Sequence, residues 1–276
     1  MAKSTPPAKT RTSTTPARSE TSETLRFLLK LALFVFILRS FIFAPFNIPS
    51  ESMLPRLLVG DFLFVSKWNY GYSRWSLPWG LPLIPGQIFG RNPTPGDVVV
   101  FRAPVVQDHD VIKRVIGLPG DTVQMRAGQL VLNGKAIPKQ RVADFTLPLT
   151  PNFDAKLCGA PFQDVDAAGV PICRYPRFRE TLPNGRSYFV LDQAELPDRD
   201  DTGVYTVPAG HVFVMGDNRD DSGDSRFAPP DGMGMVPMDH LEGKAVVTFF
   251  STDGTASLLP WTWFSAARWS RIGEGF

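Results

Sequence analysis

One apolar run near the N-terminus constrains this chain more than any other feature. Residues 25–46 read LRFLLKLALFVFILRSFIFAPF. A helix of about 22 residues is long enough to span a hydrocarbon core of roughly 30 Å. Lys30 and Arg39 lie toward different ends of the run, where a long side chain can reach the nearer interface. We therefore expect a transmembrane anchor helix over residues 25–46, with an amphipathic helix lying on the membrane surface as the alternative.

The residues around this run set its expected orientation. Residues 1–24 are rich in Ser, Thr, Pro, Lys and Arg and have few apolar side chains, which predicts a disordered tail. Basic residues outnumber acidic ones there, and such an excess marks the cytoplasmic side. No small-x-small cleavage site follows the run at residues 44–49, so we expect a retained anchor and not a removed signal peptide. The remainder of the chain then lies outside the membrane.

Beyond the anchor, short Val/Ile/Phe-rich runs separated by Gly, Pro and Asp predict β-strands. They lie at residues 62–67, 97–102, 110–117, 121–125, 129–133, 187–191, 211–216 and 244–250. Asn133-Gly134 is typical of a two-residue type I′ hairpin turn. No helical segments alternate with these strands, so we expect a mainly β, antiparallel domain over residues 47–257.

Three segments differ from this pattern. Residues 68–90 and 258–276 are rich in aromatic residues, which favour membrane interfaces, although packing on the β domain is an equal alternative. Residues 138–186 are Pro-rich and contain both cysteines, which favours an insertion or a small subdomain. In an exported domain Cys158 and Cys173 would be expected to pair, with two unrelated thiols as the alternative. Such a disulfide would contribute about 3 kcal/mol by the chain-entropy estimate.

Charge and motif content argue against several functions. The formal net charge is only +2, so no basic field points to nucleic acid as a partner. The chain has neither zinc-type Cys/His spacing nor a Gly-rich phosphate loop. We therefore expect no cofactor and no metal.

Two serines directly after the anchor are candidates for a nucleophile. Ser50 and Ser52 lie in IPSESMLP (48–55), where a lone serine is most often a turn residue. A serine hydroxyl becomes a useful nucleophile only beside a general base, which is usually histidine. Of the three histidines in the chain, His109 is the candidate, because it precedes Lys113 by four residues and shares its strand face.

Lysine is the other possible base, but it accepts a proton only when neutral. Lowering its pKa from about 10.4 to about 7 or 8 requires burial among apolar groups and costs roughly 3 to 4 kcal/mol. Lys113 fits this demand, because it lies in the apolar strand DVIKRVIG (110–117). The alternative is an exposed edge-strand lysine that deters aggregation, and that interpretation applies with more force to Lys67.

Four segments together resemble a known family. IPSESMLP (48–55), GDFLFVSK (60–67), KRVIGLPGD (113–121) and GDNRDDSGDSR (216–226) follow the expected anchor in this order. They resemble the four conserved boxes of bacterial type I signal peptidases, the membrane-bound Ser/Lys endopeptidases of family S26. The resemblance spans most of residues 46–226 and implies an antiparallel β-sheet catalytic domain of signal-peptidase type with an N-terminal transmembrane helix.

The resemblance also implies roles for the matching residues. Ser52 would be the nucleophile and Lys113 its general base. The Ser50 hydroxyl and the Ser52 backbone N–H would form the oxyanion hole, and such donors can contribute about 3 to 4 kcal/mol. Ser222 would orient the lysine amine. Asp224 and Arg226 would form a supporting ion pair. Residues 217–220 would stabilise the loop of residues 216–226 without taking part in the reaction.

The implied substrate is a preprotein whose signal peptide ends in a small-x-small motif. Shallow pockets would accept alanine and exclude bulk, while the peptide adds as a strand beside the sheet. The expected pocket residues are Phe46, Ile48, Pro49, Met53 and Ile112. The implied partners are preprotein signal peptides, the phospholipid bilayer and the secretion translocon. The implied location is the bacterial inner membrane, with the N-terminus cytoplasmic and the catalytic domain periplasmic.

Glu51 departs from the family pattern, which has glycine or another small residue between the two serines. An acid near a developing oxyanion opposes catalysis unless its side chain points to water. Two other functions stay open at this stage. One is a related Ser/Lys peptidase dedicated to a single secreted substrate of pilus or conjugation type. The other is a catalytically idle, membrane-tethered β binding module, against which the intact Ser50, Ser52 and Lys113 argue.

Overall fold

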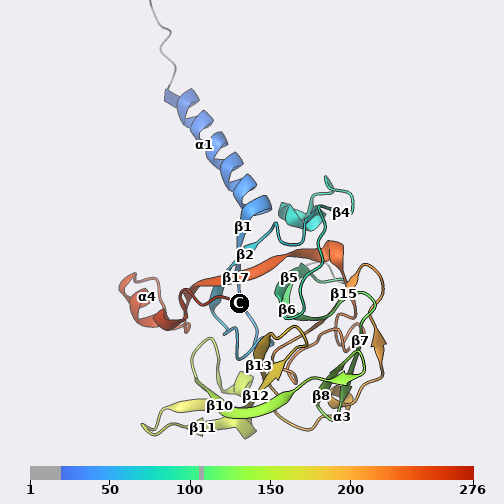
Figure 1. Ribbon diagram of the computed structural model, residues 1–276. Coiled ribbons are helices and arrows are strands. Elements are labelled where there is room, and N and C mark those ends of the chain that lie inside the picture. The colour runs from blue at the N-terminus through green and yellow to red at the C-terminus, as the bar shows by residue number, and fades with distance from the viewer. Residues whose placement is uncertain (1–19, 106–108) are drawn as a thin grey trace, which may run out of the picture. The chain divides into compact units, whose positions relative to one another are not determined.

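The computed structural model describes residues 20–105 and 109–276, and the chain divides into two compact units. The first unit is Met1–Ile37, whose described part is the helix α1 (Glu20–Ile37). The second, Leu38–Phe276, contains all the sheets (Figure 1). Of the tail expected at residues 1–24, residues 1–19 lie outside the described residues. Residues 20–24, also expected in that tail, belong to α1.

The apolar run does not form one continuous helix. α1 ends at Ile37, a π-helical turn η1 covers Leu38–Ile42, and strand β1 covers Phe43–Asn47. The expected helix over residues 25–46 is therefore wrong at its C-terminal end. Pro45 accounts for part of the difference, because proline breaks a helix but is tolerated in an edge strand such as β1. Among the described helices, none combines the length and the apolar content needed to cross a membrane.

A seven-stranded antiparallel sheet forms the frame of the larger unit (Figure 1). Its strand order is β1-β2-β17-β5-β6-β15-β16. The further bounds are β2 (Asp61–Ser66), β5 (Val98–Arg102), β6 (Asp110–Gly117), β15 (His211–Met215), β16 (Val236–Pro237) and β17 (Leu241–Ser251). Val and Phe side chains from β5, β6 and β15 pack into one buried cluster, which explains why these apolar runs become central strands.

A smaller sheet has the order β14-β7-β8-β9. Its strands are β7 (Thr122–Arg126), β8 (Gln129–Leu132), β9 (Lys135–Ala136) and β14 (Tyr205–Thr206). Asn133 and Gly134 join β8 to β9 with φ angles of 52° and 74°. A type I′ turn requires positive φ at both positions, so the predicted hairpin turn is confirmed.

Residues 138–186 contribute most of a third sheet within the same larger unit. It contains β10 (Lys139–Pro148), β11 (Gln163–Val165), β12 (Pro171–Thr181) and β13 (Ser187–Leu191). A disulfide joins Cys158, at the end of the short helix α2 (Ala155–Cys158), to Cys173 in β12. Both cysteines share a buried apolar cluster with Leu54, which lies two residues after Ser52. This sheet therefore packs directly against the turn that carries the candidate nucleophile.

The two aromatic segments are partly buried and partly exposed. Tyr70 and Trp75 are buried, whereas Trp79 is 90% exposed. In the C-terminal segment, Trp261 and Trp263 are 67% and 54% exposed. The short elements here are β3 (Tyr72–Ser73), β4 (Gln87–Ile88), α4 (Trp261–Ala266) and the 3-10 turns η2 (Arg74–Ser76), η3 (Pro78–Gly80) and η6 (Trp269–Arg271). Elsewhere lie α3 (Pro197–Asp200), η4 (Ala160–Phe162) and η5 (Met238–His240). The expected mainly antiparallel β architecture is confirmed.

Candidate active site

Ser52 lies in the turn between β1 and β2. Leu54 N donates to Glu51 O at 2.9 Å, and Leu57 N donates to Met53 O at 3.0 Å. The side chains of Met53, Leu54 and Leu57 are fully buried beneath this turn. Apolar burial after the serine therefore fixes its backbone, while its hydroxyl points to Lys113 in strand β6.

Lys113 reaches Ser52 from the centre of β6. Its Nζ donates to Ser52 Oγ at 2.5 Å, across a sequence separation of 61 residues. The lysine is buried, with 4% of its surface exposed, and it pairs with Val99 in β5. Two segments that are remote in sequence thus bring a hydroxyl and an amine into direct contact.

Burial of Lys113 makes its neutral form more accessible than that of an ordinary lysine. Burial lowers the pKa of Lys113 from 10.5 to about 8, although the carboxylates of Asp224, Asp217 and Glu51 act to raise it. A lysine with that pKa is neutral in roughly one-tenth of molecules at pH 7. The amine is therefore able to accept a proton near neutral pH, which an ordinary lysine is not.

A second buried lysine, Lys67, has a different partner. Lys67 was expected to be exposed, yet its side chain is buried and its Nζ lies 2.7 Å from Glu242 Oε2. Burial raises the pKa of Glu242 to about 7, against the opposing effect of Lys67. Because Lys67 contacts a carboxyl group and Lys113 contacts a hydroxyl, Lys113 is the better placed of the two to act as a base.

Three buried ion pairs hold the loop of residues 216–226. The pairs are Arg114 with Asp217 (2.6 Å), Arg219 with Glu180 (2.5 Å) and Arg226 with Asp224 (2.9 Å). Arg114 follows Lys113 in β6, so the first pair ties this loop to the strand that carries the amine. Asn218 N also donates to Ser52 O at 3.1 Å. The loop is thus connected to both halves of the Ser52–Lys113 contact.

Ser222 is buried next to the backbone of Ser52. A Cβ added at Gly216 would overlap Ser222 Oγ and lie 2.6 Å from Ser52 O, so only glycine leaves room for this approach. Within residues 20–105 and 109–276, the Ser222 hydroxyl has no hydrogen-bond partner, and the amine of Lys113 is bonded to Ser52. The structure places Ser222 at the site without a bond to the lysine.

Asp224 stabilises the loop of residues 216–226 through its carboxylate. Its carboxylate accepts a hydrogen bond from Gly216 N at 3.0 Å and pairs with Arg226. Burial acts to raise the pKa of Asp224, but the Arg226 charge and these hydrogen bonds hold that pKa below its usual value. Asp224 is therefore ionised at neutral pH.

A cavity of about 290 Å³ opens over Ser52 and Lys113. The expected pocket residues that line it are Phe46, Ile48, Pro49 and Ile112, and the exposed Ser50 lies at it as well. Met53 does not line it, because its side chain is fully buried in an apolar cluster with Leu57 and Leu63.

Sequence reasoning missed several lining residues of this cavity. They are Asn47, Val100, His109, Asp110 and Val111. His109 was considered only as a rival base; it is exposed and lies immediately before β6. The pairing register of β5 and β6, which places Val100 opposite Ile112, is the signal that would have identified β5 as the second strand lining the cavity.

Comparisons with known proteins identify the family. The family model described as signal peptidase, peptidase S26, matches residues 21–250. Signal peptidase I of Rickettsia typhi (strain ATCC VR-144 / Wilmington) is 37% identical over 234 residues, covering 82% of this chain and 78% of the relative. Signal peptidase I of Rickettsia canadensis (strain McKiel) is 36% identical over 251 residues, covering 88% and 84%.

A solved structure of a signal peptidase I from Enterococcus faecalis V583 is 27% identical and covers 56% of this chain and 97% of that chain. Its TM-score of 0.29 is too low for a comparison of the folds. The family and sequence matches make the protein a hydrolase of the serine endopeptidase class. More specifically, the chain belongs to the signal peptidase family, peptidase S26.

Proposed function

We propose that this protein is a membrane-bound signal peptidase that removes N-terminal signal peptides from exported preproteins. It cuts after a small-x-small motif, with Ser52 as nucleophile and Lys113 as general base. The observation that carries the proposal is the 2.5 Å contact between Lys113 Nζ and Ser52 Oγ, made by a buried amine whose pKa is about 8. Relatives at 36–38% identity are named signal peptidase I, which supports the substrate class.

In the proposed reaction, the neutral amine of Lys113 removes the proton from Ser52 Oγ as this oxygen attacks the scissile carbonyl carbon. The protonated amine then donates that proton to the departing amino group, and the signal peptide remains as an ester on Ser52. Water hydrolyses this ester with the same amine as base. The same amine accepts and donates one proton in each of the two steps, so one lysine is sufficient.

The oxyanion would be held by Ser52 N–H and the Ser50 hydroxyl. Ser52 N–H has no acceptor in the part of the chain that the structure describes, and Ser50 lines the same cavity. Donors fixed at this position can accelerate acyl transfer by about 10²- to 10³-fold. Glu51 lies between the two serines, and its side chain is partly exposed, so its charge can stay hydrated.

The cavity walls support the preference for small residues. Phe46, Ile48 and Ile112 place bulky apolar groups on the wall of this cavity, and we propose that they exclude large side chains from the positions next to Ser52. The proposal assigns supporting roles to Ser222 and to the pair of Asp224 and Arg226. It places the chain in the bacterial inner membrane with the N-terminus cytoplasmic, on the strength of the apolar run and the basic residues before it.

The test is cleavage of a preprotein bearing an Ala-x-Ala site by the full-length, detergent-solubilised protein. We expect Ser52→Ala and Lys113→Ala to lose at least about 10³-fold in kcat/KM, as expected when a member of a catalytic unit is removed. His109→Ala should keep most of the activity. A matched preprotein with phenylalanine in place of both alanines should remain uncut.

The pH profile separates the two candidate bases. With Lys113 as base, activity rises with pH and reaches half of its maximum near pH 8, where half of the amines are neutral. With a histidine base the half-maximum would lie near pH 6.5, the usual histidine pKa. Activity that survives in Lys113→Ala but is lost in His109→Ala would falsify the Ser/Lys assignment. A parent protein that cleaves no preprotein would favour the binding module or the single-substrate peptidase.

A further inference from the structure

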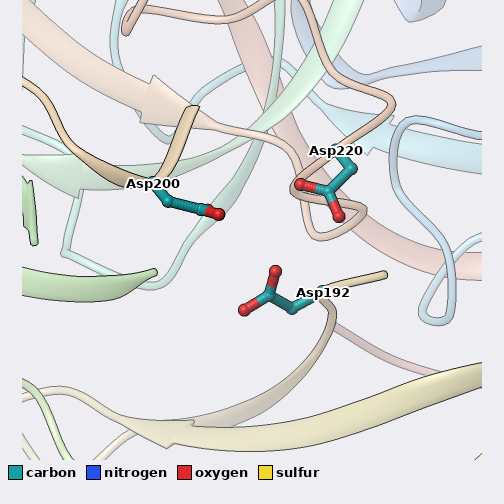
Figure 2. A group of neighbouring side chains, drawn as sticks. All are labelled: Asp192, Asp200 and Asp220. Carbon is teal, nitrogen blue, oxygen red and sulfur yellow. The ribbon is translucent and has the colours of Figure 1, made fainter. Parts of the chain in front are cut away.

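Three aspartates meet on the side of the larger unit formed by the second and third sheets. Asp192 follows β13, Asp200 ends α3, and Asp220 belongs to the loop of residues 216–226. One carboxylate oxygen from each lies within 4.8 Å of the others. Figure 2 shows the three side chains pointing toward a common space. Sequence reasoning gave no reason to combine these residues, because the fold alone brings them together.

A buried oxygen of this group has no hydrogen-bond partner among the residues that the structure describes. Asp220 is 6% exposed, and its Oδ2 accepts hydrogen bonds from Gln193 N (2.6 Å) and Ala194 N (3.1 Å). Its Oδ1 is buried and has no hydrogen-bond partner in the described chain. Both oxygens of Asp220 face the space between Asp192 and Asp200 (Figure 2). A buried carboxylate oxygen normally has a donor or a cation beside it.

The charges around the group are not balanced. Lys139 is the nearby cation, and its Nζ contacts Asp192 Oδ2 and donates to Gly128 O at 2.7 Å. Lys139 is thus one ammonium group beside three carboxyl groups. Arg226 also acts on Asp200 through its charge, but Arg226 is already paired with Asp224.

Two of the three aspartates, Asp192 and Asp200, line a cavity from which an ion could reach the group. This cavity has a volume of about 590 Å³ and is also lined by Gly128. Carboxylate and carbonyl oxygens are ligands for hard cations, and Ca²⁺ accepts six to eight of them in flexible geometry, with water filling open positions. The absence of His and Cys from the group disfavours zinc.

We propose that Asp192, Asp200 and Asp220 form a binding site for a divalent cation of the calcium class. The cation ties the end of β13 and the helix α3 to the loop of residues 216–226, the same loop whose Asn218 N contacts Ser52 O. Its role is to brace this loop, and it takes no part in peptide cleavage. Lys139 competes with the cation for Asp192.

The test is calorimetric titration of the full-length, detergent-solubilised protein with CaCl₂ after treatment with a chelator. We expect one saturable site and a rise in the unfolding temperature with Ca²⁺. Asp200→Asn should weaken binding by more than the roughly 10- to 100-fold that loss of an outer-shell partner costs. Asp198→Asn is the matched control, since it removes the same charge from an exposed position two residues away and should bind like the parent.

Lys139→Gln tests the competition, because removing the ammonium should tighten Ca²⁺ binding. Should Asp200→Asn fail to fold, Asp192→Asn carries the same expectation at a less buried position. No saturable binding by the parent, an unchanged affinity in Asp200→Asn, or equal losses in Asp198→Asn would overturn the proposal. Weaker binding in Lys139→Gln would overturn it as well.

Discussion

At the scale of single residues, the requirement for a neutral amine links sequence to chemistry. A lysine in an apolar strand pointed to Lys113, and its contact with Ser52 is what the fold adds. Met53 shows the limit of such reasoning. The family resemblance implied that it lines the substrate pocket, yet the turn directs the methionine into the core while the serine faces the cavity. The direction of a side chain in a turn depends on tertiary packing that no local pattern encodes.

The same burial should make Lys113 destabilising. Its folded pKa of about 8 lies below its value of 10.5 in water, so between these pH values the unfolded chain binds more protons. The cost is fully present below pH 8 and disappears as pH rises toward 10.5. A shift of this size corresponds to about 3 kcal/mol.

We therefore expect Lys113→Met to be inactive but more stable than the parent at pH 7, by up to about 3 kcal/mol. The gain should shrink between pH 8 and 10, because the parent loses its penalty there. Urea unfolding of both proteins at pH 7 and pH 10 measures the difference, and effects common to both proteins cancel. Equal stability of the two proteins at pH 7 would show that burial of the Lys113 amine does not destabilise the folded protein.

At the scale of elements, the local sequence pattern predicted the strands well wherever a run of apolar residues is bounded by turn residues. β6 and β13 have the predicted limits of residues 110–117 and 187–191. The end of α1 was missed because hydrophobicity does not separate a buried or membrane helix from the strand that follows it. β1 exists because β2 pairs with it across Phe43–Asn47, which is a tertiary contact.

The loop of residues 216–226 depends on one glycine for its approach to Ser52. Gly216→Ala should lower kcat/KM by about 10²-fold, since a displacement near 1 Å at a catalytic group can cost that much. The added methyl group would press on Ser222 Oγ and on the Ser52 carbonyl oxygen. The cleavage assay measures the loss, with circular dichroism to verify folding.

Gly203→Ala is the control, because a Cβ there meets nothing within 4 Å. It should behave like the parent. A fully active Gly216→Ala would mean that the loop can move away without disturbing the nucleophile.

At the scale of the whole molecule, the site is an assembly of distant segments. The four boxes could be recognised from the sequence as a set, whereas the pairing of Arg219 with Glu180 could not, because Glu180 lies in β12 outside every box. Charged pairs at such separations have no periodic signature in sequence. The same holds for the three aspartates, which come from elements belonging to different sheets and loops.

The exposed aromatic residues of the C-terminal segment lead to a prediction about the membrane. Trp261 and Trp263 present large apolar surfaces to solvent, and such side chains favour the bilayer interface. In vesicles of phospholipids with brominated acyl chains, we expect the fluorescence of the full-length protein to be partly quenched. Replacing both residues with phenylalanine should remove much of the quenchable emission, because these indoles would lie within reach of the bromine atoms.

Trp75→Phe is the matched control, since Trp75 is buried and should contribute mainly unquenched light. An unchanged quenchable fraction in the double variant would show that this segment faces water, and its aromatic surface would then need another partner.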